Sequence, residues 1–217
     1  MSTTAKSNAK STTRRKPAQS AQERPAAQVV QFPFECPKPR QTHPAEAVAV
    51  VREVSKDAVK IFLMPRPSAV RCILNETFGP LGWGERRYFA DGRLWCAVGV
   101  FNPYMGDYCF RDAAAFEGKH PGSPERWKEE TSFVAAAELW GVGSDVLALP
   151  PIVLRGDQVA ISSVQKPGRK PEDVPQVVGY RLASPLSVDK FLRDPDTGGI
   201  ISVQFADKDG RKITWEK

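Results

Sequence analysis

The sequence has few of the residues that build metal sites and disulfide frameworks. Its 217 residues include four cysteines and two histidines, and no cysteine stands in a CxxC pair or at the spacing of a zinc ligand set. Glycine-rich phosphate loops, GxSxG and HExxH patterns are also absent. The sequence therefore predicts a protein that is not an enzyme and that needs no metal or cofactor.

Long apolar runs are missing as well. No stretch approaches the roughly 20 apolar residues that cross a bilayer, and no apolar segment follows the N-terminus as it does in a secretory signal. With so few cysteines, we expect a cytoplasmic protein in a reducing compartment, without a membrane partner. The Ser-, Thr-, Lys- and Arg-rich start leaves import into an organelle open as an alternative.

Acidic residues are scarce at the N-terminus. The first 31 residues carry six basic side chains and one acidic side chain, which gives five of the six net positive charges of the chain. Residues 1–45 are rich in Pro, Ser and Thr and poor in apolar residues, so they cannot bury enough surface to offset the entropy of ordering. We predict a disordered basic tail there, which is either only flexible or also contacts nucleic-acid phosphates. Residues 46–217 are long enough for one domain.

Apolar periodicity within this domain predicts an α+β fold. Ala47–Met64 contains two apolar runs that indicate either two short strands or a strand and a turn. A helix capped by Ser68 and ended by Gly79 follows. From Trp83 to Ala115 the period changes to two, which indicates three antiparallel strands joined by turns. Glu125–Leu147 reads as a single buried helix with a polar start and an apolar end, which runs into a glycine-marked stop where Gly141 would close it in a left-handed conformation. We expect this helix to cover the three-stranded meander. The core is therefore a β-β-β-α unit.

The C-terminal part is less regular. The sequence predicts a polar loop from Arg155 to Pro175, and a strand over Gln176–Leu182. Apolar alternation on both sides of an Asp-Gly turn predicts a β-hairpin formed by 200–205 and 212–216.

Basic and aromatic residues alternate along the predicted meander. Arginines bind phosphates and flat rings stack on bases, so such a strand surface suits sequence-tolerant binding of single-stranded nucleic acid. The alternative is a solvated sheet face with the aromatic rings in the core. The interleaved rings are Tyr88, Phe89, Trp95, Tyr104 and Tyr108, and the candidate DNA-binding residues are Arg86, Arg87, Arg93, Arg111, Lys119, Arg126 and Lys128.

Three segments carry a family resemblance. ILNETFGPLGW (Ile73–Trp83), the meander DGRLWCAVGVFNPYMGDYCFRDA and SFVAAAELWGVG (Ser132–Gly143) together resemble the Rad-fifty-two/Rad-twenty-two-like single-strand annealing proteins, especially the phage-borne Sak-type members. The family pattern is a helix ending in FG, a nearby GW, a β meander, and a helix closing on aromatic-Gly-aliphatic-Gly. The resemblance covers residues 48–217 in outline and is strongest over 67–154, with 155–217 as a C-terminal extension.

The resemblance implies a β-β-β-α core that assembles side by side into rings or arcs. Such assemblies hold single-stranded DNA in a basic groove and anneal complementary strands without ATP in recombination and repair. The implied partners are single-stranded DNA and further copies of the chain, with other recombination or replication proteins as additional candidates. The implied location is the nucleoid or a phage-infected bacterial cell.

One position departs from the family pattern. The family carries a Lys-Arg pair directly after the helix aromatic, and here Val134 and Ala135 follow Phe133. Either other basic residues hold the DNA, or the chain is a non-enzymatic assembly or adaptor protein that keeps the fold and has lost strong DNA binding. Val134 would, as a further alternative, widen the apolar contact between neighbouring subunits.

Overall fold

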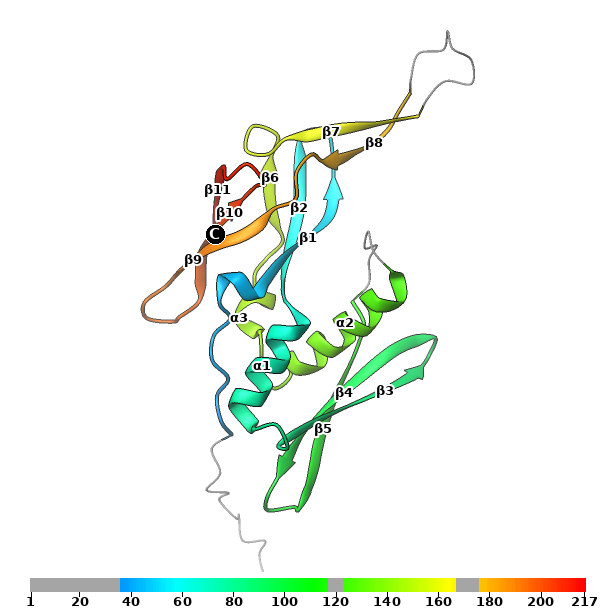
Figure 1. Ribbon diagram of the computed structural model, residues 1–217, viewed down its shortest axis with the longest axis vertical. Helices are drawn as coiled ribbons and strands as arrows, with labels where there is room; N and C mark the ends of the chain where they lie inside the picture. The colour runs from blue at the N-terminus through cyan, green and yellow to red at the C-terminus, as the bar shows by residue number, and fades with distance from the viewer. Residues whose placement is uncertain (1–35, 117–122, 167–175) are drawn as a thin grey trace, which may run out of the picture. The chain divides into compact units, whose positions relative to one another are not determined.

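The computed structural model describes residues 36–116, 123–166 and 176–217 (Figure 1). Antiparallel sheets and three α-helices make up these residues, so the α+β class predicted from the sequence is confirmed. Residues 1–35 of the predicted tail and the candidate Lys119 lie outside the described residues.

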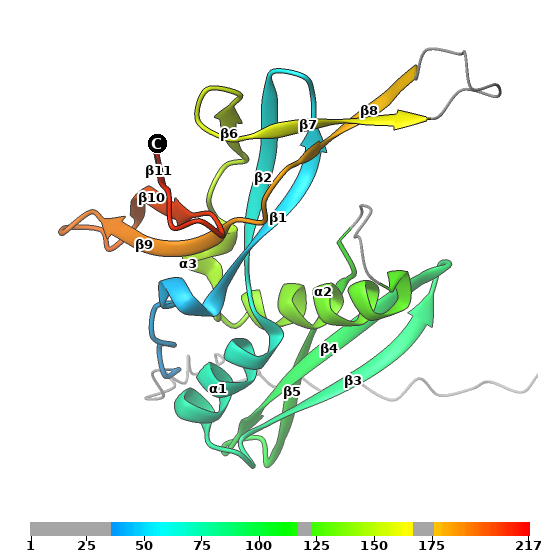
Figure 2. The ribbon, with the colours of Figure 1, turned by 45° about the horizontal axis from the view of Figure 1, so that its top comes forward.

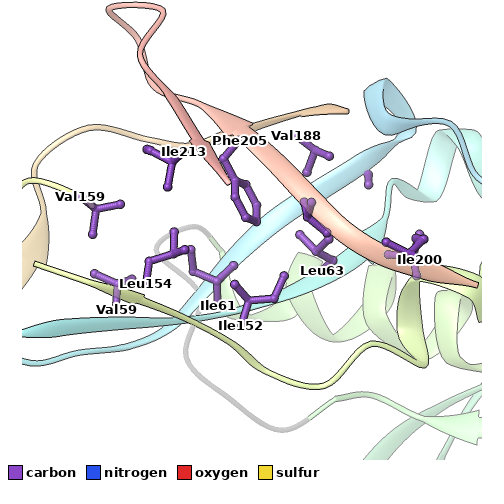
Figure 3. Close-up of a cluster of buried hydrophobic side chains, with 13 residues drawn as sticks. Val59, Ile61, Leu63, Ile152, Leu154, Val159, Val188, Ile200, Phe205 and Ile213 are labelled. Atoms are coloured by element: carbon purple, nitrogen blue, oxygen red, sulfur yellow. The ribbon is translucent and has the colours of Figure 1, made fainter. Parts of the chain in front are cut away.

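Two three-stranded sheets form the upper half in Figures 1 and 2. The first joins β1 (Ala47–Val54), β2 (Ala58–Pro65) and β6 (Ile152–Arg155), with β2 in the centre. The second joins β9 (Ser187–Arg193), β10 (Ile200–Ala206) and β11 (Lys212–Glu216), with β10 in the centre. Alternate residues of β2 face the second sheet and build an aliphatic core around a phenylalanine, as Figure 3 shows with Val59, Ile61, Leu63, Ile152, Leu154, Phe205 and Ile213.

The second core lies between the meander and the helices. β3 (Trp83–Ala90), β4 (Arg93–Asn102) and β5 (Asp107–Ala114) form the predicted antiparallel meander, and α2 (Pro124–Glu138) packs on one of its faces (Figure 2). α1 (Pro67–Phe78) adds Val70, Ile73 and Leu74 to the same core. Ser68 does not cap α1 as predicted, because the helix begins at Pro67 and Arg66 is the N-cap residue.

The predicted helix Glu125–Leu147 is two helices. α2 ends at Glu138, and a short α3 (Ser144–Leu147) follows after a turn. Gly141 and Gly143 in this turn have φ angles of 84° and 74°, a left-handed conformation that glycine adopts without strain. At Gly143 a Cβ atom would also lie 2.6 Å from Cγ of Pro65, so the close approach of β2 requires glycine here. The left-handed Gly141 is thus present as predicted, whereas α2 already ends at Glu138 and the last residues of the predicted stretch form the separate helix α3.

The middle of α2 is enclosed on all sides. Every residue from Thr131 to Ala137 is buried, because the meander covers one side of the helix and α1 with β1 and β2 covers the other. Val134 is 0% exposed and Ala135 is 7% exposed. The proposed role of Val134 in a contact between subunits is therefore wrong for this fold, since its side chain lies inside its own chain. A basic pair at these two positions would equally be buried.

The segment before β1 is part of the folded unit. Thr42 is 2% exposed, its hydroxyl donates to Oδ1 of Asp145 at 2.8 Å, and its backbone N–H donates to Oδ2 at 3.0 Å. The guanidinium of Arg193 donates to the same carboxylate at 2.7 Å and to the Thr42 carbonyl at 2.8 Å. Arg40 forms ion pairs with Glu46 (2.7 Å) and Glu76 (2.6 Å). The disorder predicted for residues 1–45 is therefore wrong for residues 40–45, because Arg40 and Thr42 have specific polar partners.

The C-terminal part contains more strands than the sequence predicts. Gln176–Leu182 (β8) and the hairpin β10–β11 are present as predicted, whereas β9 has no predicted counterpart. The predicted loop after Arg155 includes β7 (Ile161–Lys166), which pairs with β8. β7 was missed because it is short, polar and exposed, and only its pairing with β8 defines it.

Candidate nucleic-acid interface

The meander has two different faces, and the strand register assigns each residue to one of them. Glu85, Arg87, Cys96, Val98 and Arg111 belong to the face that α2 covers. In the described part of the chain, no helix or strand lies over the opposite face (Figure 2). We call this opposite surface the aromatic face, and its residues include Arg86, Tyr88, Arg93, Trp95, Phe101, Tyr108, Phe110 and Asp112.

The rings of the aromatic face form two connected groups. Tyr88 and Trp95 are direct cross-strand partners whose rings are parallel within 9° at a centroid distance of 6.4 Å. Phe101 and Tyr108 are also direct partners and meet edge-to-face at 5.4 Å, and Tyr108 continues to Phe110 at 6.2 Å. Tyr88 and Phe101 are 41% and 40% exposed. The alternative interpretation, in which the meander aromatics fill the core, is wrong for these residues.

One glycine, Gly99, makes room for this arrangement. Gly84 and Gly99 are cross-strand partners, and Gly99 also faces Phe110 on the third strand. A Cβ atom at Gly99 would lie 2.5 Å from Cε1 of Phe110, so the ring occupies the space of the missing side chain. The guanidinium of Arg86 lies above the same ring, 4.1 Å from its centroid. Phe110 is thus held between the backbone of β4 and a cation, an attractive geometry for both partners.

The aromatic face carries more positive than negative charge. Arg86 and Arg93 project from β3 and from the start of β4, and both are exposed. Asp112 is the carboxylate on this face, and its Oδ2 accepts a hydrogen bond from the Tyr88 hydroxyl at 2.6 Å. This hydrogen bond to Asp112 raises the pKa of Tyr88 above its ordinary value. The face therefore offers flat rings with cations beside them.

Two other predicted residues, Arg87 and Arg126, line a separate hollow beside the start of α2. This α2 groove has a volume of about 880 Å³, and Arg66, Arg71 and Trp127 also line it. Most of its arginines are already paired with carboxylates: Arg87 with Glu85 (3.2 Å) and Glu129 (3.4 Å), Arg71 with Glu85 (2.7 Å), and Arg126 with Glu130 (2.7 Å). The potential in the groove is therefore mixed rather than strongly positive.

The remaining predicted residues lie elsewhere. Arg111 donates to the carbonyl of Leu139 just after α2 and covers the Trp140 ring at 4.5 Å, so it stabilises the end of the helix. Lys128 is exposed on α2. The structure thus brings Arg86 and Arg93 together on the aromatic face and Arg87 and Arg126 together in the α2 groove, while Arg111 and Lys128 join neither group.

Sequence reasoning missed several residues of both surfaces. Phe101 and Phe110 follow the period of two that places Trp95 and Tyr108 on the aromatic face, so strict alternation would have found them. Arg66 and Arg71 belong to the region of the first helix, which precedes the meander in the sequence. No local sequence pattern connects them to Arg87. Among residues 36–116, 123–166 and 176–217, no group of three or more His, Cys, Asp or Glu could hold a metal ion.

Comparisons with protein-family models, with curated proteins and with solved structures found no match for this chain. Within the described part of the chain, no helix is both long enough and apolar enough to cross a membrane.

Proposed function

We propose that this protein binds single-stranded DNA on the aromatic face and anneals complementary strands without ATP, as a homo-oligomer. The observation that carries the proposal is the row of partly exposed rings on an uncovered sheet face, with Arg86 stacked on one of them. Aromatic platforms flanked by cations bind single strands with little sequence preference, because every base has a face that stacks. The resemblance of the three segments Ile73–Trp83, the meander and Ser132–Gly143 to single-strand annealing proteins supports the same function.

The aromatic face suits annealing in particular. Bases that stack on Tyr88, Trp95 or Phe101 keep their hydrogen-bonding edges free for a second strand, while Arg86 and Arg93 screen the phosphates. No bond to the protein forms or breaks, so neither a nucleophile nor a cofactor is required. The basic N-terminal tail adds salt-sensitive affinity for either strand.

The fold and assembly state belong to the proposal as well. The β-β-β-α arrangement of β3, β4, β5 and α2 is the core that the resemblance implies, and we propose that it is an annealing-protein fold whose copies associate side by side. Since Val134 and Ala135 are buried, the position of the family's basic pair contributes nothing to binding here. DNA contacts must come from other residues, and the aromatic face supplies them.

The test is binding of a fluorescent single-stranded oligonucleotide at two salt concentrations. Tyr88→Ser combined with Phe101→Ser removes two exposed rings, and we expect a loss of affinity of roughly tenfold or more, since each stacked base contributes about 1–3 kcal/mol. Arg86→Gln should weaken binding and reduce its salt dependence, whereas Arg181→Gln, an exposed arginine on β8, is the matched control. Deletion of residues 1–31 should flatten the salt dependence. Absence of binding by the wild type at low salt would refute the proposal.

A second function has an observation in its favour. Most arginines of the α2 groove are paired with glutamates, which is unfavourable for a polyanion, so an assembly or adaptor protein that has lost strong DNA binding is the competing proposal. Light scattering separates the two: large oligomers together with no nucleic-acid affinity would support the adaptor.

A further inference from the structure

A second hollow lies between the β1–β2 hairpin and the C-terminal end of α2. Its volume is about 460 Å³, within the range of small-molecule sites in proteins. It is separate from the aromatic face and shares no residue with it. Its lining residues are Arg52, Glu53, Lys60, Phe62, Phe116, Glu138, Leu147 and Pro151.

Two aromatic rings form one part of the wall of this hollow. Phe62 and Phe116 meet edge-to-face with their ring centroids 6.2 Å apart, and Phe62 packs in the same way on Trp127 at 6.4 Å. The backbone N–H of Phe116 donates to Oγ1 of Thr131 in α2 at 3.1 Å, which holds the end of the strand region in place. These contacts hold the two rings in place. The rings are therefore a preorganised surface for a planar ligand, because little side-chain entropy is lost on binding.

Two cations lie at the same hollow. The guanidinium of Arg52 covers the Phe62 ring at 4.7 Å from its centroid, and Lys60 projects from the same face of β2 as Phe62. Glu53, which is the register partner of Lys60, contributes one carboxylate. A ligand that combines a flat ring system with a phosphate would meet both kinds of group.

Glu138 contributes a second carboxylate to the lining of the hollow. Its carboxyl lies on the last turn of α2, and burial raises its pKa. Guanine is the base whose Watson–Crick edge presents two adjacent donors, N1–H and N2–H, which match the two oxygens of an ionised carboxylate. Adenine, cytosine and thymine each present at least one acceptor there, which a carboxylate repels.

We propose that this hollow is a binding site for one guanine nucleotide, with the base against Phe62 and Phe116, the Glu138 carboxylate on N1–H and N2–H, and Arg52 and Lys60 on the phosphate. The nucleotide comes either from solution or as one unit of a bound strand. The first source is independent of single-strand binding, and the second rests on the function proposed above.

Isothermal titration of the full chain with dGMP, dAMP, dCMP and dTMP tests the free-nucleotide source. We expect dGMP to bind with a dissociation constant below about 1 mM and at least roughly tenfold more tightly than the others. Glu138→Gln leaves one acceptor and should reduce dGMP affinity roughly tenfold, with Glu216→Gln on the exposed face of β11 as the matched control. Lys60→Gln should weaken dGMP but not guanosine, whereas Lys56→Gln in the β1–β2 turn should change neither.

A thymine oligonucleotide with one central guanine, compared with the all-thymine strand, tests the second source. If the guanine strand binds more tightly than the all-thymine strand and Glu138→Gln abolishes this difference, one nucleotide of a bound strand occupies the hollow. Equal binding of both strands together with selective dGMP binding would assign the site to the free nucleotide. The proposal is overturned if dGMP binds no more tightly than the other nucleotides and the guanine strand binds no more tightly than the all-thymine strand. It is also overturned if Glu138→Gln changes neither the affinity for dGMP nor that for the guanine strand. Both outcomes count even where the wild type still binds single strands.

Discussion

Substitution of Gly99 tests the geometry of the aromatic face most sharply. In Gly99→Ala the new methyl group would lie 2.5 Å from Cε1 of Phe110 and 2.8 Å from two other atoms of the ring, so Phe110 must leave its place above β4. Overpacking of this kind costs about 1–3 kcal/mol. Reduced freedom of the unfolded chain offsets about 0.4–1 kcal/mol of this cost, so we expect a net destabilisation between about 0 and 2.6 kcal/mol.

The same change should also weaken DNA binding. When Phe110 moves, Arg86 loses the ring beneath its guanidinium, and Tyr108 loses a neighbour at 6.2 Å. We expect single-strand affinity to fall roughly tenfold, the equivalent of about one lost stacking contact. Urea unfolding measures the stability, and fluorescence anisotropy with a labelled oligonucleotide measures the affinity.

Gly84→Ala is the matched control for this experiment. Gly84 is the cross-strand partner of Gly99 on the same face, yet a Cβ atom there would have nothing within 4 Å. We expect Gly84→Ala to be neutral or slightly stabilising and to bind DNA like the wild type. The reasoning fails if the two alanine variants bind alike, or if Gly99→Ala binds normally while Phe110 is displaced.

Three further predictions concern other parts of the chain. Asp145→Ala leaves the partly buried guanidinium of Arg193 without its carboxylate and should lower the free energy of unfolding by about 2–4 kcal/mol in urea titrations. The hydrogen bonds from Arg40 lower the pKa of Glu46 to about 2, below its value of 4.5 in the unfolded chain, so this contribution to stability is complete above pH 4.5 and is lost as the pH falls towards 2. Burial raises the pKa of Cys96 to about 11, so at pH 8 iodoacetamide should label the exposed cysteines and leave Cys96 unlabelled in mass spectra until the protein unfolds.

Each of these has a result that would contradict it. A stability loss below 0.5 kcal/mol for Asp145→Ala would show that Arg193 finds water or another acceptor instead. Glu46→Gln should flatten the acid limb of the stability profile, and an unchanged profile would assign that limb to other carboxylates. Equal labelling rates for Cys96 and the exposed cysteines would show that the meander opens on the timescale of alkylation.

The fold could be predicted where local signals are strong. The Asp91-Gly92 turn and the alternating residues on both sides of it predict β3 and β4, and the structure has both with this turn between them. The left-handed stop at Gly141 is predicted and present, but the sequence does not predict that α2 ends at Glu138 and that a separate α3 follows, where Gly143 lies against Pro65. The close approach of Pro65 comes from a segment nearly eighty residues earlier, which no local pattern records.

For the candidate site, too, local sequence patterns predict some features, whereas contacts between distant segments decide others. The alternation of residues along the strands predicts correctly that these basic and aromatic residues lie on the meander, but it does not predict which face of the meander α2 covers. Arg87 and Arg111 therefore counted as DNA-binding candidates, although the structure pairs Arg87 with Glu85 and Glu129 and places Arg111 on the end of α2. Their partners are distant in sequence, since packing of α2 on the meander creates these contacts.

Annealing of two complementary oligonucleotides, followed by fluorescence energy transfer in the absence of ATP, tests the central claim most directly. We predict that the wild type accelerates pairing, that Tyr88→Ser combined with Phe101→Ser removes most of this acceleration, and that Arg87→Gln in the α2 groove retains it. No acceleration by the wild type, or full acceleration by the variant that lacks both exposed rings, would contradict the account.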